Sequence, residues 1–216
     1  AALVEPVAVA VQVAKTADLR ANQAVLVFGC GPIGVLCQAV AKAYGATKVI
    51  GVDVSEARTE FARAFTADGV FVSKTTQSSG SDADPVESQI TADDIISQFQ
   101  LGEGADVVLE CTGAEPCIQA GIFATKKGGT FVQAGMGKEN VVFPITAACT
   151  RGLTIKGSIR YTTGCYQQAV QLISSGRVQP ARLITHRFAF DDADKAFETV
   201  KRAEESTLKV MIAGVQ

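Results

Sequence analysis

The sequence has no cluster of side chains that could hold a zinc ion. It contains one histidine, His186, and its six cysteines are scattered, with no C-x-x-C pair and no H-E-x-x-H motif. A lone histidine near a terminal strand is more often structural than catalytic. A usable Tyr-x-x-x-Lys pair is also missing, because Tyr44 and Lys48 span an expected helix end and strand start. The chain therefore lacks the usual groups that remove a proton from an alcohol.

Strong net charge and long apolar runs are absent as well. The formal net charge is -2 at pH 7, aromatic residues make up 6%, and no run of Lys or Arg occurs. Neither a nucleic-acid surface nor a polybasic membrane patch is indicated, so the expected partner is a small soluble ligand. Nothing at the amino terminus combines a basic n-region with a cleavage site, and the scattered cysteines are expected to be reduced thiols of a cytoplasmic protein.

The apolar segment 3–14 is too short to cross a bilayer and predicts a helix that is apolar on nearly every side. Pro6 suits a first helical position. Such a helix is normally buried. Because the sequence also begins at Ala1 without a methionine, we expect it to belong to a larger protein whose neighbouring part covers this helix.

The fold class expected from the pattern is α/β, a doubly wound parallel sheet of the Rossmann type. Apolar runs of about five residues alternate with longer amphipathic segments, which is typical of parallel strands covered by helices on both faces. The expected strands are 24–28, 48–52, 70–72, 105–109, 130–134 and 153–158, and the expected helices between them are 32–44, 55–65, 91–100 and 114–126. The polar stretch 73–84 is expected to be a surface loop. Beyond Tyr161 we expect helices at 164–175 and 191–203, an apolar stretch at 183–185 and a last strand at 208–213.

The most informative motif is Gly29-Cys30-Gly31-Pro32-Ile33-Gly34, which joins the first expected strand to a helix. Gly29 permits a tight turn, Gly31 lets the backbone approach a pyrophosphate, and Gly34 lets the helix pack close to the sheet. The free N–H groups of the helix then face the phosphates. Asp53 ends the next strand, where its carboxylate suits a free ribose diol and repels a 2′-phosphate. The motif therefore predicts an NAD site, with NAD favoured over NADP.

Residues that follow the later strands are further candidates, because ligands of open parallel sheets cross the carboxyl ends of the strands. These segments are 110–113 (Glu-Cys-Thr-Gly), 134–137 (Ala-Gly-Met-Gly) and 158–161 (Ser-Ile-Arg-Tyr). We expect the small residues of the first two to let a nicotinamide ring and its ribose lie against backbone, with contacts from Thr112 and Gly135. Simple turn chemistry is the alternative for both.

Two arginines are also candidates. Arg58 suits the adenine face or a phosphate, and a solvated arginine is the alternative. Arg160 and Tyr161 offer a forked cation and a phenol for a hydroxylated substrate, and an ordinary ion pair is the alternative for the arginine.

Together with Glu5-Pro6 and the segment 185–188 (Thr-His-Arg-Phe), these motifs resemble the zinc-dependent polyol dehydrogenases of the medium-chain dehydrogenase/reductase superfamily. The likeness covers essentially the whole chain and is nearest to sorbitol and xylitol dehydrogenases. It implies hydride transfer from a polyol to NAD to give a ketose. It also implies that a GroES-like catalytic domain upstream of Ala1 holds the zinc, so that zinc is expected only in the intact enzyme and this chain alone is expected to be inactive.

The resemblance also implies roles for single residues. Glu5 matches a glutamate that contacts the zinc through water or contacts substrate, and Arg160 and Tyr161 match residues that meet the polyol. Asp53 and Arg58 match the adenosine-binding pair. The other residues that match cofactor contacts are Ile33, Cys111, Thr112, Ala134, Gly135, Met136, Ser158, Ile159 and, a second time, Arg160.

The domain division that the resemblance implies has three parts. Residues 1–16 would be a remnant helix joining the missing catalytic domain, residues 17–162 the NAD-binding domain, and residues 163–216 a helix-strand segment that returns to the catalytic domain. Dimers or tetramers joined through the edge of the cofactor sheet are expected.

Two other functions are kept open. A zinc-free quinone reductase of the same superfamily needs no metal, although Glu5, Arg160 and Tyr161 argue against it. A regulatory domain that senses NAD without chemistry is the second, and a methyltransferase is less consistent with the glycine motif because its cofactor has no pyrophosphate.

Overall fold

The computed structural model describes residues 1–74, 83–202, 204 and 206–214. Its centre is a six-stranded sheet in the order β3-β2-β1-β4-β5-β6, in which all neighbouring strands are parallel. The strands are β1 (Ala24–Phe28), β2 (Lys48–Asp53), β3 (Gly69–Val72), β4 (Ala105–Glu110), β5 (Thr125–Gln133) and β6 (Thr154–Gly157). The doubly wound sheet expected from the sequence is confirmed. Its strand order reverses between β1 and β4, which is where ligands bind in sheets of this kind.

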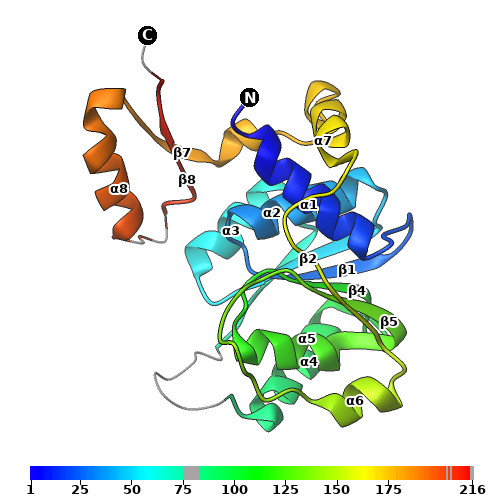
Figure 1. Ribbon diagram of the computed structural model, residues 1–216. Coiled ribbons are helices and arrows are strands. Elements are labelled where there is room, and N and C mark those ends of the chain that lie inside the picture. The colour runs from blue at the N-terminus through cyan, green and yellow to red at the C-terminus, as the bar shows by residue number, and fades with distance from the viewer. Residues whose placement is uncertain (75–82, 203, 205, 215–216) are drawn as a thin grey trace.

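Helices cover both faces of this sheet (Figure 1). One face carries α1 (Val4–Thr16), α2 (Pro32–Ala43), α3 (Glu56–Phe65) and α7 (Cys165–Ser174). The other carries α4 (Pro85–Phe99), α5 (Glu115–Ala124) and α6 (Ile145–Thr150). Each layer has its own buried apolar cluster, as expected when strands are covered on both sides.

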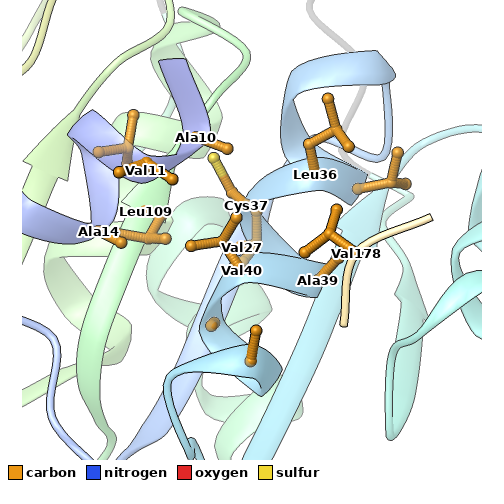
Figure 2. Close-up of a cluster of buried hydrophobic side chains, with 14 of the residues drawn as sticks. Ala10, Val11, Ala14, Val27, Leu36, Cys37, Ala39, Val40, Leu109 and Val178 are labelled. Atoms are coloured by element: carbon orange, nitrogen blue, oxygen red, sulfur yellow. The ribbon is translucent and has the colours of Figure 1, made fainter. Parts of the chain in front are cut away.

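The apolar helix α1 is buried by other helices of this chain. Figure 2 shows Ala10, Val11 and Ala14 of α1 beside Cys37 and Val40 of α2. On another side α1 packs against α7. The apolar character of α1 is therefore satisfied within this chain, because α2 and α7 already bury it.

Most elements end within two residues of the expected positions, and three differ more. α4 begins at Pro85 rather than at 91, because the Asp84 carboxylate accepts a hydrogen bond from the Val86 N–H (2.8 Å) and proline suits the first helical turn. β5 begins at Thr125 instead of 130, with a shift of register against β4 between Ala105 and Val107. α6 was not expected at all.

The segment 163–216 contains two structurally different parts. α7 belongs to the main core, where Cys165, Ala169 and Leu172 are buried. After the 3₁₀ turn Pro180–Leu183, the chain forms β7 (Ile184–Phe188), the 3₁₀ turn Phe190–Asp192, α8 (Ala193–Lys201) and β8 (Lys209–Ile212). β7 and β8 pair in parallel as a separate two-stranded sheet, which projects from the main body together with α8 (Figure 1). Within the described residues, no helix is long and apolar enough to cross a membrane.

Candidate functional site

The turn between β1 and α2 leaves open space above Gly31. Gly29 has the left-handed φ of 97° that the tight turn requires, and its N–H donates to the Val52 carbonyl oxygen (2.7 Å). Gly31 is the N-cap of α2 and Pro32 follows in its first turn; no side chain caps the helix. A Cβ placed on Gly31 would meet no atom within 4 Å. Because Pro32 carries no N–H, the first amides that this helix offers to an anion are those of Ile33 and Gly34.

Gly34 has the opposite environment. A Cβ built on it would lie 1.8 Å from the Gly29 carbonyl oxygen. The helix therefore packs directly on the turn, as the motif predicts, and only glycine fits this position. Ile33, which precedes Gly34 in the sequence, is half-buried against the apolar cluster of this face.

Asp53, the last residue of β2, is fixed beside the same turn. Its Oδ2 accepts the Cys30 N–H (2.7 Å) and its Oδ1 accepts the Ser55 N–H (3.0 Å). The sequence motif and the acid that it predicts are thus joined by a hydrogen bond. Burial, followed by the charge of Asp53, raises the pKa of the Cys30 thiol to about 12, so this cysteine is no nucleophile at neutral pH.

Arg58 is half-buried in the first turn of α3 rather than fully solvated. Its Nε is buried and has no hydrogen-bond partner among the described residues. An unpaired buried donor is costly, so this position suits an acceptor from a ligand.

On the other side of the turn, a hydrogen-bond network organises the loops after β4 and β5. Glu110 ends β4 and is fully buried (0% exposed). Its carboxylate accepts the Thr112 N–H (2.8 Å), the Gly113 N–H (2.8 Å), the Thr112 hydroxyl and the Gln133 Nε2 (2.7 Å). Gln133 also donates to the Gly135 carbonyl oxygen (2.8 Å). The sequence alone predicts no role for Glu110 or Gln133. The signal that points to Glu110 in the sequence is a carboxylate at the end of an apolar strand.

The glycines of these two loops pack against each other. A Cβ on Gly135 would lie 2.2 Å from the Gly113 nitrogen, and one on Gly137 would lie 1.9 Å from the Gly113 oxygen. Gly135 is thus required for loop-to-loop contact. The same loop reaches the first turn, because a Cβ on Gly29 would lie 2.9 Å from Thr112 Cγ2.

The remaining residues predicted after β4 and β5 vary in exposure. Ala134 and Cys111 are half-buried and Met136 is 84% exposed. Cys111 lies with its Sγ 3.9 Å from the Cys37 Sγ, and that neighbour together with burial raises the pKa of the Cys111 thiol. The loops border a hollow of about 430 Å³ that Gly135 and Met136 help to line.

The segment after β6 is held by α1. The Gln12 Oε1 accepts the Thr162 N–H (3.1 Å) and hydroxyl (2.6 Å), and the Thr16 hydroxyl lies 3.4 Å from the Ser158 Oγ. Arg160 has a left-handed φ of 48°, an uncommon conformation for a residue with a side chain. No pattern in the sequence predicts the hydrogen bonds between Gln12 and Thr162.

The residues matched to substrate lie partly at the surface. Ile159 and Arg160 are exposed, and Arg160 forms no ion pair with any described residue, so the ion pair considered from the sequence is absent there. The Tyr161 ring meets Tyr166 edge to face with 4.9 Å between centroids, and the hydroxyl of Tyr161 raises the pKa of Tyr166 to about 12. Glu5 is exposed at the start of α1.

Other hollows and the lone histidine lie apart from the network around Glu110. Glu5, Pro32 and Ile33 help to line a hollow of about 340 Å³ between α1, α2 and the projecting sheet. A larger one of about 730 Å³ lies between β3 and α4. His186 lies on β7, with its Nδ1 2.9 Å from the Thr185 hydroxyl. In the part of the chain that is described, no three His, Cys, Asp or Glu residues lie together as a metal site.

Comparison with known proteins now defines the class. The sequence profile described as "Zinc-binding dehydrogenase" matches residues 32–175, so the chain belongs to the zinc-binding dehydrogenase family. D-xylulose reductase A of Aspergillus oryzae is 43% identical over 215 residues, which are 100% of this chain and 57% of that protein. The chain thus spans little more than half the length of this curated relative.

Solved structures agree on the fold. 2R,3R-butanediol dehydrogenase of Bacillus subtilis superposes with a TM-score of 0.83 at 26% identity, over 99% of this chain and 57% of that one. A zinc-binding dehydrogenase of Sinorhizobium meliloti, solved bound to NADP, superposes with a TM-score of 0.74 at 25% identity, over 90% of this chain and 54% of that one. The family resemblance based on the sequence motifs is confirmed.

The two helix glycines give a paired prediction about folding. Gly34→Ala forces its methyl group into the Gly29 carbonyl oxygen, so we expect a loss of at least about 2 kcal/mol in the free energy of unfolding. Gly31→Ala meets open space at an ordinary φ of -71° and is expected to change stability by less than about 1 kcal/mol. Urea denaturation of both variants measures this. Equal stability of the two would contradict the packing described here.

Proposed function

We propose that this chain is the cofactor-binding part of an NAD-dependent polyol dehydrogenase. The observation that carries the proposal is the unobstructed space at Gly31, at the amino end of α2 and next to the anchored carboxylate of Asp53. Phosphate groups bind well at such helix ends, because unpaired N–H groups and the helix dipole both favour negative charge.

The contacts of the described residues fit NAD. The diphosphate would lie on the amides that follow Gly31, and the adenosine ribose would hydrogen-bond to Asp53. The unpaired Nε of Arg58 offers one further donor on this side. Gly29, Pro32, Ile33 and Gly34 shape the turn. When bound, the nicotinamide supplies the acceptor for hydride, and the chain supplies binding and orientation.

The loops after β4, β5 and β6 would receive the nicotinamide half. Cys111, Thr112, Ala134, Gly135 and Met136 follow β4 and β5. Ser158, Ile159 and Arg160 follow β6 and would contact the cofactor from the next strand end.

The substrate side of the proposal rests on the names of relatives and on three residues. The name D-xylulose reductase favours a polyol of the xylitol or sorbitol type, oxidised to a ketose. Arg160 and Tyr161 would contact its hydroxyl groups, and Glu5 would lie near the metal or the substrate. Residues outside this chain would hold the zinc, and the segments 1–16 and 184–214 would adjoin the domain that carries it.

Assembly and cellular location are also proposals. β6 is the edge strand of the sheet and Ile155 on it is 42% exposed, which supports a homodimer or tetramer joined there. The six free cysteines support a reducing, cytoplasmic environment. No contact in the described residues specifically favours a zinc-free quinone reductase or an NAD sensor.

Gly31→Val tests the cofactor site directly. The side chain would occupy the space that the diphosphate needs, so we expect at least about a hundredfold weaker NAD binding in calorimetry, with an unchanged circular dichroism spectrum. Gly214→Val is the matched control, because it too meets no atom within 4 Å. Retained NAD affinity in Gly31→Val would contradict the proposed pose.

Asp53→Asn tests the preference between the two dinucleotides. The amide oxygen can still accept the Cys30 N–H, the Ser55 N–H loses its acceptor, and the negative charge that repels a 2′-phosphate is removed. We expect the preference for NAD over NADP to fall by about tenfold or more, measured as the ratio of the two dissociation constants. Asp93→Asn, on the exposed side of α4, is the control. An unchanged ratio would remove Asp53 from the ribose site.

The proposed reaction is tested in the whole enzyme. We expect xylitol or sorbitol to drive NADH formation, measured by absorbance, and a zinc chelator to abolish it. Quinone reduction that survives the chelator would favour the zinc-free reductase instead. NAD binding without any turnover of the whole enzyme would favour the sensor.

A further inference from the structure

Glu110 is a buried carboxylate, and in the described part of the chain all of its hydrogen-bond donors are neutral. Both of its oxygens accept two hydrogen bonds, Oε1 from the N–H and hydroxyl of Thr112 and Oε2 from Gly113 and Gln133. Among the described residues, no Lys, Arg or His forms an ion pair with it. Its four donors come from neutral groups.

The donor set shows which form of Glu110 this site holds. Two backbone N–H groups and one amide N–H can only donate to it, so they need acceptors on both oxygens. That arrangement suits the ionised carboxylate. Burial raises the pKa of Glu110 and its hydrogen bonds oppose this, with Thr112 and Gly113 as the main donors. At neutral pH the geometry therefore holds a negative charge away from water.

A second buried carboxylate in the same layer provides the contrast. Glu115, in the first turn of α5, is 1% exposed and pairs with Lys138 at 3.3 Å. Its charge is compensated by that lysine, and its other oxygen accepts the Val142 N–H (3.1 Å). Of these two buried acids, only Glu110 leaves a net negative charge in place.

The position of Glu110 relates this charge to the proposed cofactor. A dinucleotide with its diphosphate at Gly31 and its adenosine at Asp53 on β2 must extend toward β4 and β5, on the other side of β1. Glu110 is the last residue of β4, and the turn that it anchors adjoins Gly29. Its charge therefore lies behind the loops that would face the nicotinamide.

We propose that Glu110 is a positioning residue whose buried negative charge makes this site favour the oxidised dinucleotide over the reduced one. The inference rests on the proposed function. The oxidised nicotinamide ring carries a positive charge, which is lost when the ring takes up a hydride with its electron pair. A nearby carboxylate stabilises only the charged ring. Bound NADH is consequently a stronger hydride donor, and NAD⁺ is held more tightly, than without this charge.

Glu110→Gln is the direct test, because it removes the charge and nearly preserves the shape. The dissociation constants of NAD⁺ and NADH are measured separately on the full chain, by calorimetry and by NADH fluorescence. We expect the ratio of the NAD⁺ to the NADH constant to rise by roughly threefold to tenfold. A merely structural role for Glu110 would weaken both forms equally and leave this ratio unchanged, which would overturn the inference.

Two control variants keep the buried charge at Glu110. Glu115→Gln removes a compensated carboxylate, and Gln133→Leu removes one donor from Glu110 without changing its charge. We expect both to leave the ratio within about twofold of the unmodified chain. A shift in Glu115→Gln as large as that in Glu110→Gln would overturn the assignment to Glu110.

A second charge variant covers the case in which Glu110→Gln does not fold. Gln133→Lys would place an ammonium group where an amide already lies 2.7 Å from the carboxylate, and should raise the ratio in the same direction. An unchanged ratio in folded Gln133→Lys would overturn this inference and leave the proposed function standing. Failure of the unmodified chain to bind either form would overturn the proposed function itself, and this inference with it.

Discussion

The central constraint is the meeting of three backbone features at the amino end of α2. The left-handed turn at Gly29, the empty space above Gly31 and the close packing of Gly34 on the turn all point the first helical amides at one open position. The Asp53 carboxylate is fixed there through the Cys30 N–H. Since unpaired helical amides favour an anion, everything proposed about cofactor, hydride and substrate depends on this position.

The surrounding structure keeps that position rigid from both sides. On one side, α1 and α7 complete the layer that buries α2, and Gln12 of α1 holds the segment after β6 in place. On the other side, Glu110 joins the loop after β4 to the loop after β5 through Gln133. Both supports fix the strand ends across which a dinucleotide would extend.

Much of the fold and of the first half of the site follows from local patterns in the sequence. The strand, the glycine turn and Asp53 have fixed roles along the chain, so their spacing predicts them. Contacts between distant segments gave no such signal, because they depend on tertiary neighbours. Examples are the packing of Gly113 on Gly135, the hydrogen bonds to Glu110 and the hydrogen bonds from Thr162 to Gln12. The packing of α1 on α2 and α7 was not predicted for the same reason.

The most direct measurement is a crystal structure of this chain with NAD bound. The account predicts the diphosphate within hydrogen-bond distance of the amides after Gly31, the adenosine ribose on Asp53, and the nicotinamide beside the loops after β4 and β5. A dinucleotide bound elsewhere, for example in the hollow between β3 and α4, with the position above Gly31 still empty, would contradict it.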